Sequence, residues 1–581
     1  MLLFALLAAA GCSESVSWIS FHGDALRLGW NPHETTLTPA AVASGRFGKR
    51  WDSPPFDAFG GVPARAYASP LYVADLEVTG GPYGGRVVDA VFAATSNADV
   101  YAVSTVSVRD IPAGTVLWKQ HLGDPGHRID GLRIGVLGTP VIDLKLQRLY
   151  VAADTAGSAA EGGIIWRVFA LELGSGNVLP GWPVPLAAST VEPANQNGPA
   201  VFVAAAQLSQ RGGLATSPDG KLLYVPFGGY FGGSVGWLVA IDTVNPRVAS
   251  AFSSSPEMMA GRANGGIWAS GGPSVDVDGS VWAVTGNSPR DLLDRTWGES
   301  VLRWGPGLPL KLTGTYTTWN HCQLDGGDID LCGSGVTLLP EVRGTSTPRL
   351  AVVGGKQGNV YLLDRDHLPG ALDTRPVCNW KSPTDSPADG SLWDPKAGRP
   401  YYLNSSPGPL NVFGPYSEDD GWAMKAKARS TPAAFQADDG TTYVVVTGSS
   451  KQPDLVTPRA PSVARLRVVA PSATGPAHLE LEAYETTLVF ESPGTPVISS
   501  NGGKDPIAWI VEPNIGRLDN LLNAPPATLH AVDVMRMQAL WRSKPADLYP
   551  GAKYFHPVVA RGQVIVATDR LSGFGLGAST D

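Results

Sequence analysis

The sequence has few charged residues and few cysteines for a chain of 581 residues. Charged side chains make up 17%, and the net charge of -8 leaves no excess of lysine and arginine for binding nucleic-acid phosphates. The four cysteines include no Cys-x-x-Cys pair and no cysteine at zinc-ligand spacing from a histidine. No apolar run is long enough for a membrane-spanning helix. These absences argue against a nucleic-acid-binding protein, a zinc protein and a protein with membrane-spanning helices.

Sustained helical periodicity is also lacking, whereas glycine and proline are abundant. The chain has 69 glycines and 49 prolines, and both residues favour turns and weaken strand interiors. Between the turns, short segments such as VFAATSNADVYAV and TYVVVTGSS alternate and are rich in β-branched and aromatic side chains. This pattern predicts an all-β protein of short antiparallel strands rather than βαβ units.

A repeated opening precedes these strand-like segments. A small residue or a proline starts an apolar strand, a turn follows, and further strands complete the unit. The eight openings are Ser69-Pro70, Thr139-Pro140, Ser217-Pro218, Gly272-Pro273, Ser334-Gly335, Thr431-Pro432, Thr495-Pro496 and His556-Pro557. Radial blades of about four strands explain the spacing of about 60 to 100 residues. The sequence therefore predicts an eight-bladed β-propeller, with inserted loops where the spacing is long, as in residues 378–428.

The two ends of the chain are predicted to share the eighth blade. The C-terminal segments HPVVARG, QVIVATD and SGFGL supply three strands and no fourth. Near the start, residues 46–51 (RFGKRW) form an isolated strand-like segment. Pairing the two closes the ring by hydrogen bonds and removes a free sheet edge.

Residues 1–12 are predicted to be a signal peptide, and residues 13–581 a single propeller domain. Leu2 to Ala10 is a short apolar run, and Ala9-Ala10-Gly11-Cys12 resembles a bacterial lipobox, in which the cysteine carries lipid. No lysine or arginine precedes the run, and Ala9 stands where leucine is usual. The alternative is a conventional signal peptide in which Cys12 is incidental. Either interpretation places the protein outside the cytoplasm, in the periplasm or at the outer membrane.

Three cysteines remain after the signal segment. Cys322 and Cys332 could close a short loop in an oxidising compartment, which would leave Cys378 free. Three buried thiols are the alternative.

Two segments resemble the tryptophan-docking repeat of the pyrroloquinoline-quinone (PQQ) propeller family, the quinoprotein alcohol dehydrogenase-like proteins. They are the segment from Gly114 to Trp118 and the segment from Ala531 to Trp541. Each tryptophan is expected to pack on the neighbouring blade and to donate its N–H to a backbone carbonyl. The opening WISFHGDALRLGWNPHETTLTPAAV is similar to the entry segment of polyvinyl-alcohol-dehydrogenase-like members.

The resemblance implies a set of site residues from the fourth blade onward. Trp268 matches the tryptophan beneath the quinone, and Asn287 matches the asparagine that coordinates calcium. Asp330, which aligns better than Asp328, matches the catalytic aspartate, and Lys356 matches the cation at the quinone oxygens. In this chemistry a carboxylate removes the hydroxyl proton of an alcohol, and a hard cation polarises the quinone. Each residue also has a structural explanation, such as core packing for Trp268 or turn geometry for Asn287.

The chain departs from the family pattern in two places. It has no adjacent cysteine pair, the disulfide that covers the quinone in many members. In blade three it has Tyr230 or Phe231 where the family supplies a calcium-binding glutamate, and a phenyl ring cannot bind a hard cation. It also has no Cys-x-x-Cys-His motif, so electrons would pass to a separate acceptor. Two functions remain: a quinone- and calcium-dependent oxidoreductase for an alcohol or polyol, or a non-catalytic lipoprotein scaffold that binds envelope proteins or ligands.

Overall fold

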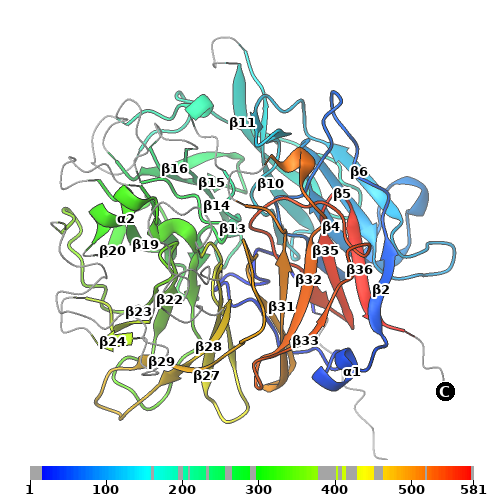
Figure 1. The fold of residues 1–581 in the computed structure, drawn as a ribbon. Coiled ribbons are helices and arrows are strands. Elements are labelled where there is room, and N and C mark those ends of the chain that lie inside the picture. The colour runs from blue at the N-terminus through cyan, green and yellow to red at the C-terminus, as the bar shows by residue number, and fades with distance from the viewer. Residues whose placement is uncertain are drawn as a thin grey trace, which may run out of the picture.

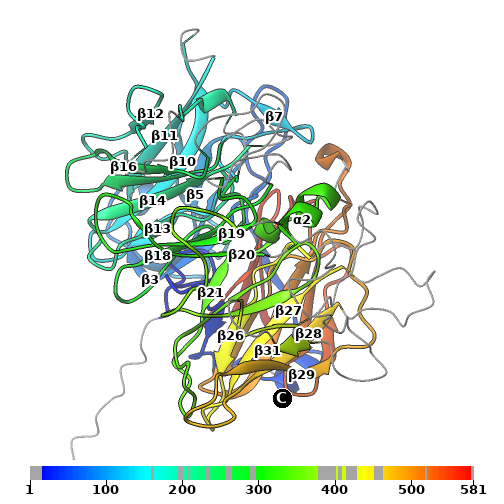
Figure 2. The same cartoon turned by 90° about the vertical axis from the view of Figure 1, so that its left-hand side faces the viewer.

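The predicted eight-bladed β-propeller is confirmed by a computed structural model. Eight sheets of four or five strands follow one another around a ring in chain order (Figure 1), and Figure 2 shows the same sheets after a quarter turn. The structure describes residues 16–158, 163–193, 200–206, 210–229, 235–255, 265–287, 296–318, 320–376, 378, 401–403, 408–413, 428–449, 462–516 and 520–577. The predicted signal segment, Tyr230 and Phe231 lie outside these residues. No helix within these ranges is long and apolar enough to cross a membrane.

The first four blades are antiparallel four-stranded sheets in which the first strand is innermost. Their strands are β3 (Leu71–Glu77), β4 (Val87–Ala94), β5 (Asp99–Ser104) and β6 (Val116–His121); β9 (Val141–Asp143), β10 (Arg148–Ala156), β11 (Ile164–Glu172) and β12 (Val184–Leu186); β13 (Ala215–Thr216), β14 (Leu222–Phe227), β15 (Trp237–Asp242) and β16 (Arg247–Ser253); and β17 (Ser274–Val275), β18 (Val281–Val284), β19 (Ser300–Trp304) and β20 (Leu312–Thr317).

The last four blades repeat this plan, with one additional strand in blade five and one in blade seven. Their strands are β21 (Val336–Leu338), β22 (Leu350–Val353), β23 (Val360–Asp364), β25 (Asn411–Phe413) and β24 (Tyr401–Leu403); β26 (Ala433–Gln436), β27 (Thr442–Thr447), β28 (Val463–Val469) and β29 (His478–Tyr484); β1 (Trp30–Asn31), β30 (Val497–Asn501), β31 (Lys504–Glu512), β32 (Thr528–Asp533) and β33 (Gln538–Arg542); and β34 (Val558–Ala560), β35 (Gln563–Ala567), β36 (Leu571–Leu576) and β2 (Phe47–Asp52). A hairpin of β7 (Arg128–Ile129) and β8 (Leu132–Arg133) and the helices α1 (Pro39–Ala43) and α2 (His321–Gly327) lie outside the blades.

Blade eight is closed by the N-terminal strand, as predicted. Strand β2 pairs antiparallel with β36, with Phe47 opposite Leu576, and the blue and red strands lie side by side in Figure 1. Phe47 also packs against Trp541 of blade seven, with ring centroids 4.8 Å apart. The seam therefore combines backbone pairing with apolar packing.

The repeated openings work as hydrogen-bonded links between adjacent blades. The backbone N–H of His556 donates to the Ser69 hydroxyl at 3.1 Å, and that of Ser69 donates to the Thr139 hydroxyl at 3.0 Å. Blades six and seven are joined in the same way, from Thr431 to Thr495. A small hydroxyl residue before proline thus satisfies a buried N–H of the preceding blade.

Seven of the eight openings precede the first strand of a blade, but Ser217-Pro218 was assigned wrongly. These two residues form the turn after β13, where the Ser217 hydroxyl accepts from Leu222 N. The sequence Ser-Pro-Asp-Gly has the composition of a tight turn as well as that of an opening. The blade is opened instead by Gly212-Gly213-Leu214, where the Leu214 N–H donates to Thr139 O.

The segment Trp18–Glu34, which we call the axial strap, hydrogen-bonds to all eight blades, at the inner strand or at the residue directly before it. Its start exchanges two backbone hydrogen bonds with Tyr72 of blade one. Its carbonyls then accept from Ile142, Val275, Leu338, Ala434 and Ile498 of blades two, four, five, six and seven, and Asn31 Nδ2 donates to Val559 O of blade eight. The contact with blade three is made by the fully buried side chain of Arg27, which donates to Leu214 O at 2.8 Å. The same guanidinium also donates to Pro273 O of blade four at 2.8 Å. The strap therefore ties the ring together from its centre.

The predicted contact with the neighbouring blade is confirmed for both docking tryptophans, and the predicted N–H bond to a backbone carbonyl is confirmed for Trp118. Trp118 Nε1 donates to Leu173 O of blade two at 3.1 Å. Trp541 of blade seven contacts both Phe47 and Phe574 of blade eight. Both indoles bridge neighbouring blades.

The predicted cysteine pairing was wrong. The disulfide joins Cys322, in α2, to Cys378, with Cα atoms 5.9 Å apart, and Cys332 is a buried free thiol. The Cys332 sulfur instead accepts from the backbone N–H groups of Trp268 and Ala269. Nearness in sequence misled the prediction because Cys332 points toward blade four, away from α2.

A buried histidine pair links the strap to blade eight. His556 donates from Nδ1 to Pro557 O, and its Nε2 accepts from His22 N at 3.0 Å, so its ring is neutral. Burial lowers the pKa of His556 to about 4 and that of His22 well below its ordinary value. Protonation of either ring opposes folding, so these rings stabilise the protein above pH 6.5, and their contribution is lost as the pH falls toward 4. We expect His556→Gln to reduce this pH dependence of the unfolding free energy by up to about 1.4 kcal/mol per pH unit.

The pH profile of the variant must be compared with that of the unsubstituted protein, because two carboxyl groups with raised pKa values act in the opposite direction. Burial raises the pKa of Glu512 to about 7 and that of Asp24 to about 6, so each favours the folded state less as the pH rises through the range from 4 to 7. Urea unfolding from pH 4.5 to 7.5 measures the difference between the two proteins. Parallel pH profiles would contradict the assignment to His556.

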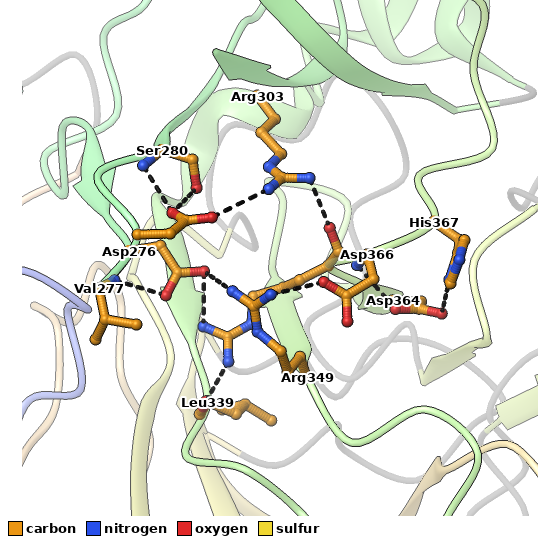
Figure 3. A network of polar contacts seen from close by, with 11 residues as sticks. Asp276, Val277, Ser280, Arg303, Leu339, Arg349, Asp364, Asp366 and His367 are labelled. Carbon is orange, nitrogen blue, oxygen red and sulfur yellow. Dashed lines mark hydrogen bonds and ion pairs between the residues drawn. The ribbon is translucent and has the colours of Figure 1, made fainter. Parts of the chain in front are cut away.

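A charge network joins blades four and five at their turns (Figure 3). The Asp276 carboxylate is buried and accepts from Arg349 at 2.8 Å and from Arg365 at 3.3 Å. Arg349 also pairs with the more exposed Asp366 at 2.7 Å. Because removing one partner leaves buried charge uncompensated, Asp276→Asn is expected to lower the unfolding free energy by about 3 kcal/mol. Asp366→Asn, at a more exposed pair, should cost less than about 1 kcal/mol in the same urea titration; equal losses would contradict this ranking.

Candidate active site

Loops of blades four and five that lie near the central axis bring together three of the predicted residues, Trp268, Asp330 and Lys356. Trp268 precedes β17, Asp330 precedes β21 just after α2 (Figure 2), and Lys356 lies in the β22–β23 turn. Backbone bonds hold these loops in place, since Lys356 N donates to Asp330 O at 2.9 Å and Cys332 accepts from Trp268 N. The positions follow from the blade plan, which gathers such loops around the axis.

Lys356 is the centre of this group. Its ammonium donates to Asp330 Oδ2 and, at 2.9 Å, to Asp328 Oδ1. The same nitrogen lies 4.7 Å from the ring centroid of Trp268. Asp330 is fully buried and Lys356 nearly so, so the ion pair is screened little by solvent.

Asn287 is placed beside this group by its backbone. Its carbonyl accepts from Gly265 N at 2.7 Å, and Gly286 N donates to Gly266 O at 3.0 Å. A Cβ on Gly286 would lie 3.0 Å from Trp268 Nε1, which shows how closely this turn approaches the indole. Asn287 itself has a φ of 30°, in the left-handed region that asparagine tolerates. The structure thus confirms the turn geometry of Asn287, and its role in binding calcium stays a prediction.

Sequence reasoning missed Glu299, a fully buried carboxyl next to Asp330. Its Oε2 accepts from Leu331 N at 2.6 Å, whereas its Oε1 and Asp330 Oδ1 are buried with no hydrogen-bond partner. Burial, and then the charge of Asp330, raise the pKa of Glu299 well above its ordinary value. The sequence feature that could have indicated Glu299 is its position directly before the apolar strand β19, because a glutamate is rarely buried without a partner.

Tyr554, before β34, lies among positive charges and, like Trp268, contacts the guanidinium of Arg211. Although burial alone would raise it, the charges of Arg211, Arg429, Lys553 and Lys356 lower the pKa of Tyr554 to about 8. A cavity of about 20 Å³, room for about one water molecule, is lined by Tyr554, Arg211 and Lys553. The potential in this part of the axial channel is therefore positive and favours anions.

Comparison with known proteins adds evidence on the fold. No protein-family model matches the chain, and no curated protein matches its sequence. Among solved structures, a europium-containing methanol dehydrogenase superposes with a TM-score of 0.56 at 13% identity, covering 96% of this chain and 98% of that one. Quinohemoprotein alcohol dehydrogenases from Pseudomonas putida and Comamonas testosteroni give 0.54 and 0.53, at 13% and 14% identity, covering 97% and 98% of this chain and 81% and 82% of theirs.

This chain has the fold of the quinohemoprotein alcohol dehydrogenases. At these identities the likeness extends to the fold alone, and the predicted roles of Trp268, Asn287, Asp330 and Lys356 stay predictions. The expected eight-bladed architecture and its resemblance to quinoprotein dehydrogenases are confirmed at that level.

The donor atoms at Asp330 fit a hard cation better than the sequence suggested. Within the described ranges no three His, Cys, Asp or Glu side chains converge as a metal site. However, the unpartnered oxygens of Glu299 and Asp330 are of the type that calcium prefers. A cation there would have to displace the proton of Glu299, and it would lie near the Lys356 ammonium, which is bonded to the other oxygen of Asp330.

Proposed function

We propose that this protein oxidises an alcohol or polyol outside the cytoplasm, with bound PQQ and a hard cation such as calcium. The observation that carries the proposal is the buried Asp330–Lys356 ion pair, which lies against Trp268 and beside Glu299. A base, a cation and an aromatic face in one enclosed place suit the removal of an alcohol's hydroxyl proton beside a bound quinone.

The chain's own residues would have separate tasks. PQQ, when bound, would supply the two-electron acceptor that no amino-acid side chain provides. Asp330 would accept the proton of the substrate hydroxyl at Oδ1, because the Lys356 ammonium occupies its Oδ2. Lys356 would stabilise negative charge at this end of the site. The surrounding apolar side chains of Leu331 and Cys332, both buried, would exclude water.

Glu299 and Asn287 would supply oxygen donors for the cation, whereas Asp330 would serve as the base. Glu299 would take the place of the family glutamate that blade three lacks at Tyr230 or Phe231. The positive field around Tyr554 suits a quinone that carries carboxylates. Electrons would leave to a separate acceptor.

The first test is binding of PQQ and calcium to the full chain. Excess of both is expected to raise the melting temperature, because a ligand that binds only the folded state stabilises it. Glu299→Gln keeps the shape of the side chain and can still accept from Leu331, but it removes a charged oxygen donor. This variant should lose most of the calcium-dependent part of the shift. No shift at a large excess of PQQ and calcium would reject the enzymatic proposal.

A second candidate is a non-catalytic scaffold of the cell envelope, anchored by lipid at Cys12. The observation in its favour is a groove of about 740 Å³ on neighbouring turns of blades three and four, where Val277 is 80% exposed and Val244 65%. Exposed apolar side chains gathered on one surface often mark a protein contact. If this groove binds a partner, Val277→Asp should abolish co-purification of an envelope protein that the unsubstituted chain retains.

A further inference from the structure

One guanidinium lies against two aromatic rings in the axial channel. The Arg211 carbon Cζ is 4.5 Å from the Trp268 ring centroid and 4.6 Å from the Tyr554 ring centroid. Arg211 Nε also donates to Trp268 O at 2.8 Å. The three side chains come from loops of blades three, four and eight, so they meet across the channel. A flat, charged group therefore already occupies the space between the two rings.

We propose that Trp268 and Tyr554 are the two walls of a slot for a flat anionic ring, and that Arg211 fills this slot until the ligand enters. The inference rests on the proposed function and adds a binding residue, Tyr554, that the resemblance did not supply. A guanidinium is planar and delocalised and stacks on aromatic faces, so its position indicates that the slot accepts a flat group. A quinone bearing carboxylates has the same flatness, and it can attract the displaced arginine as a counter-ion.

The backbone of Tyr554 supports a dedicated role for its ring. Its φ is 72°, in the left-handed region, which a bulky side chain rarely adopts. Such a conformation costs about 1 kcal/mol or more and persists only where neighbours enforce it. On one side Lys553 is buried and pairs with Asp130, and on the other His556 is fixed by Ser69. The loop is thus held so that the Tyr554 ring faces Arg211.

An adjacent cysteine pair cannot cover a ring stacked on Trp268 in this chain. Many members of the resembling family cover the quinone with such a disulfide, and this chain has none. The one disulfide that the structure describes, Cys322–Cys378, does not involve Cys332, the cysteine that contacts Trp268. Tyr554 is the aromatic side chain that shares Arg211 with Trp268, so it is placed to cover the ligand instead.

The experiment measures the dissociation constant of PQQ for the full chain in calcium buffer, by equilibrium dialysis with detection of quinone absorbance. Tyr554→Phe keeps the ring and should bind within about threefold of the unsubstituted protein. Tyr554→Asn removes the ring but tolerates a left-handed backbone, and it should bind at least about tenfold more weakly, the order expected for one lost stacking partner. Tyr549→Leu, a tyrosine outside the channel that stacks on Arg570, is the matched control and should leave binding unchanged.

The outcomes separate the two proposals. If the unsubstituted chain binds PQQ and Tyr554→Asn binds equally well, the slot is wrong and the proposed function stands. If the unsubstituted chain does not bind PQQ, the proposed function and the slot both fail. If Tyr554→Asn does not fold, judged by its melting temperature without ligand, Tyr554→Gly tests the same loss of the ring with a backbone that adopts this φ freely.

Discussion

A chain that begins at residue 54 is expected to lose cooperative unfolding. It lacks the axial strap, which bonds to every blade, and β2, the outer strand of blade eight. Blade eight would then expose the edge of β36, and inner-strand N–H groups of six blades would lose their acceptors. An unpaired buried polar group costs about 1 to 3 kcal/mol, so the summed loss is comparable to the whole stability of a domain. Circular dichroism during heating and binding of a hydrophobic dye measure the effect.

Two further proteins make this test specific to the contacts. A chain that begins at residue 16 keeps the strap and should melt as the full chain does. Arg27→Ala removes the donor to Leu214 O and Pro273 O while leaving the strap backbone in place, and it should cost about 3 to 5 kcal/mol. A shortened chain starting at residue 54 that melts in one sharp transition near the original temperature would overturn the role assigned to the strap.

Asp330→Asn is expected to lower turnover of alcohols by at least about 100-fold, the usual contribution of a positioned general base. Asparagine fills the same space but cannot accept the substrate proton. Because Lys356 keeps Asp328 as a partner, the variant should still fold and bind PQQ, although breaking the buried pair should lower its melting temperature. The measurement is reduction of an artificial electron acceptor by a panel of alcohols and polyols, with PQQ and calcium present, together with the melting temperature.

Asp328→Asn is the matched control. Asp328 also pairs with Lys356, but it is partly exposed and occupies a left-handed position that asparagine tolerates. The Asp328→Asn variant should retain turnover within about tenfold of the unsubstituted protein, because Asp328 lacks the enclosed environment that a general base needs and that Asp330 has. The reverse ranking of the two variants would assign the base to Asp328.

The sequence predicted the ring and its closure because both follow from local patterns. Alternating apolar residues, turn residues and the proline openings depend on neighbours along the chain, so they can be read without knowing the fold. Even there, the Ser217-Pro218 turn was taken for an opening, since turns and openings use the same small residues. Residues 46–51 were recognisable as the missing strand of blade eight because the C-terminal blade lacked one.

The site was predicted only in part. The resemblance indicated Trp268, Asn287, Asp330 and Lys356, and the fold places them together. It did not indicate Glu299 or Tyr554, because a lone glutamate before a strand and a lone tyrosine in a loop carry no motif. Their surroundings become special only when blades four, five and eight meet at the axis.

By itself, the amino-acid sequence determined that this chain forms eight antiparallel sheets and joins its two ends in one of them, since strand periodicity and turn chemistry are local properties. Only the tertiary structure decided which cysteines pair, that the segment Trp18–Glu34 bonds to every blade, and that Glu299 and Tyr554 lie near Asp330 and Trp268. These features depend on contacts between residues far apart in the chain, and such contacts are set by how the blades pack around the axis.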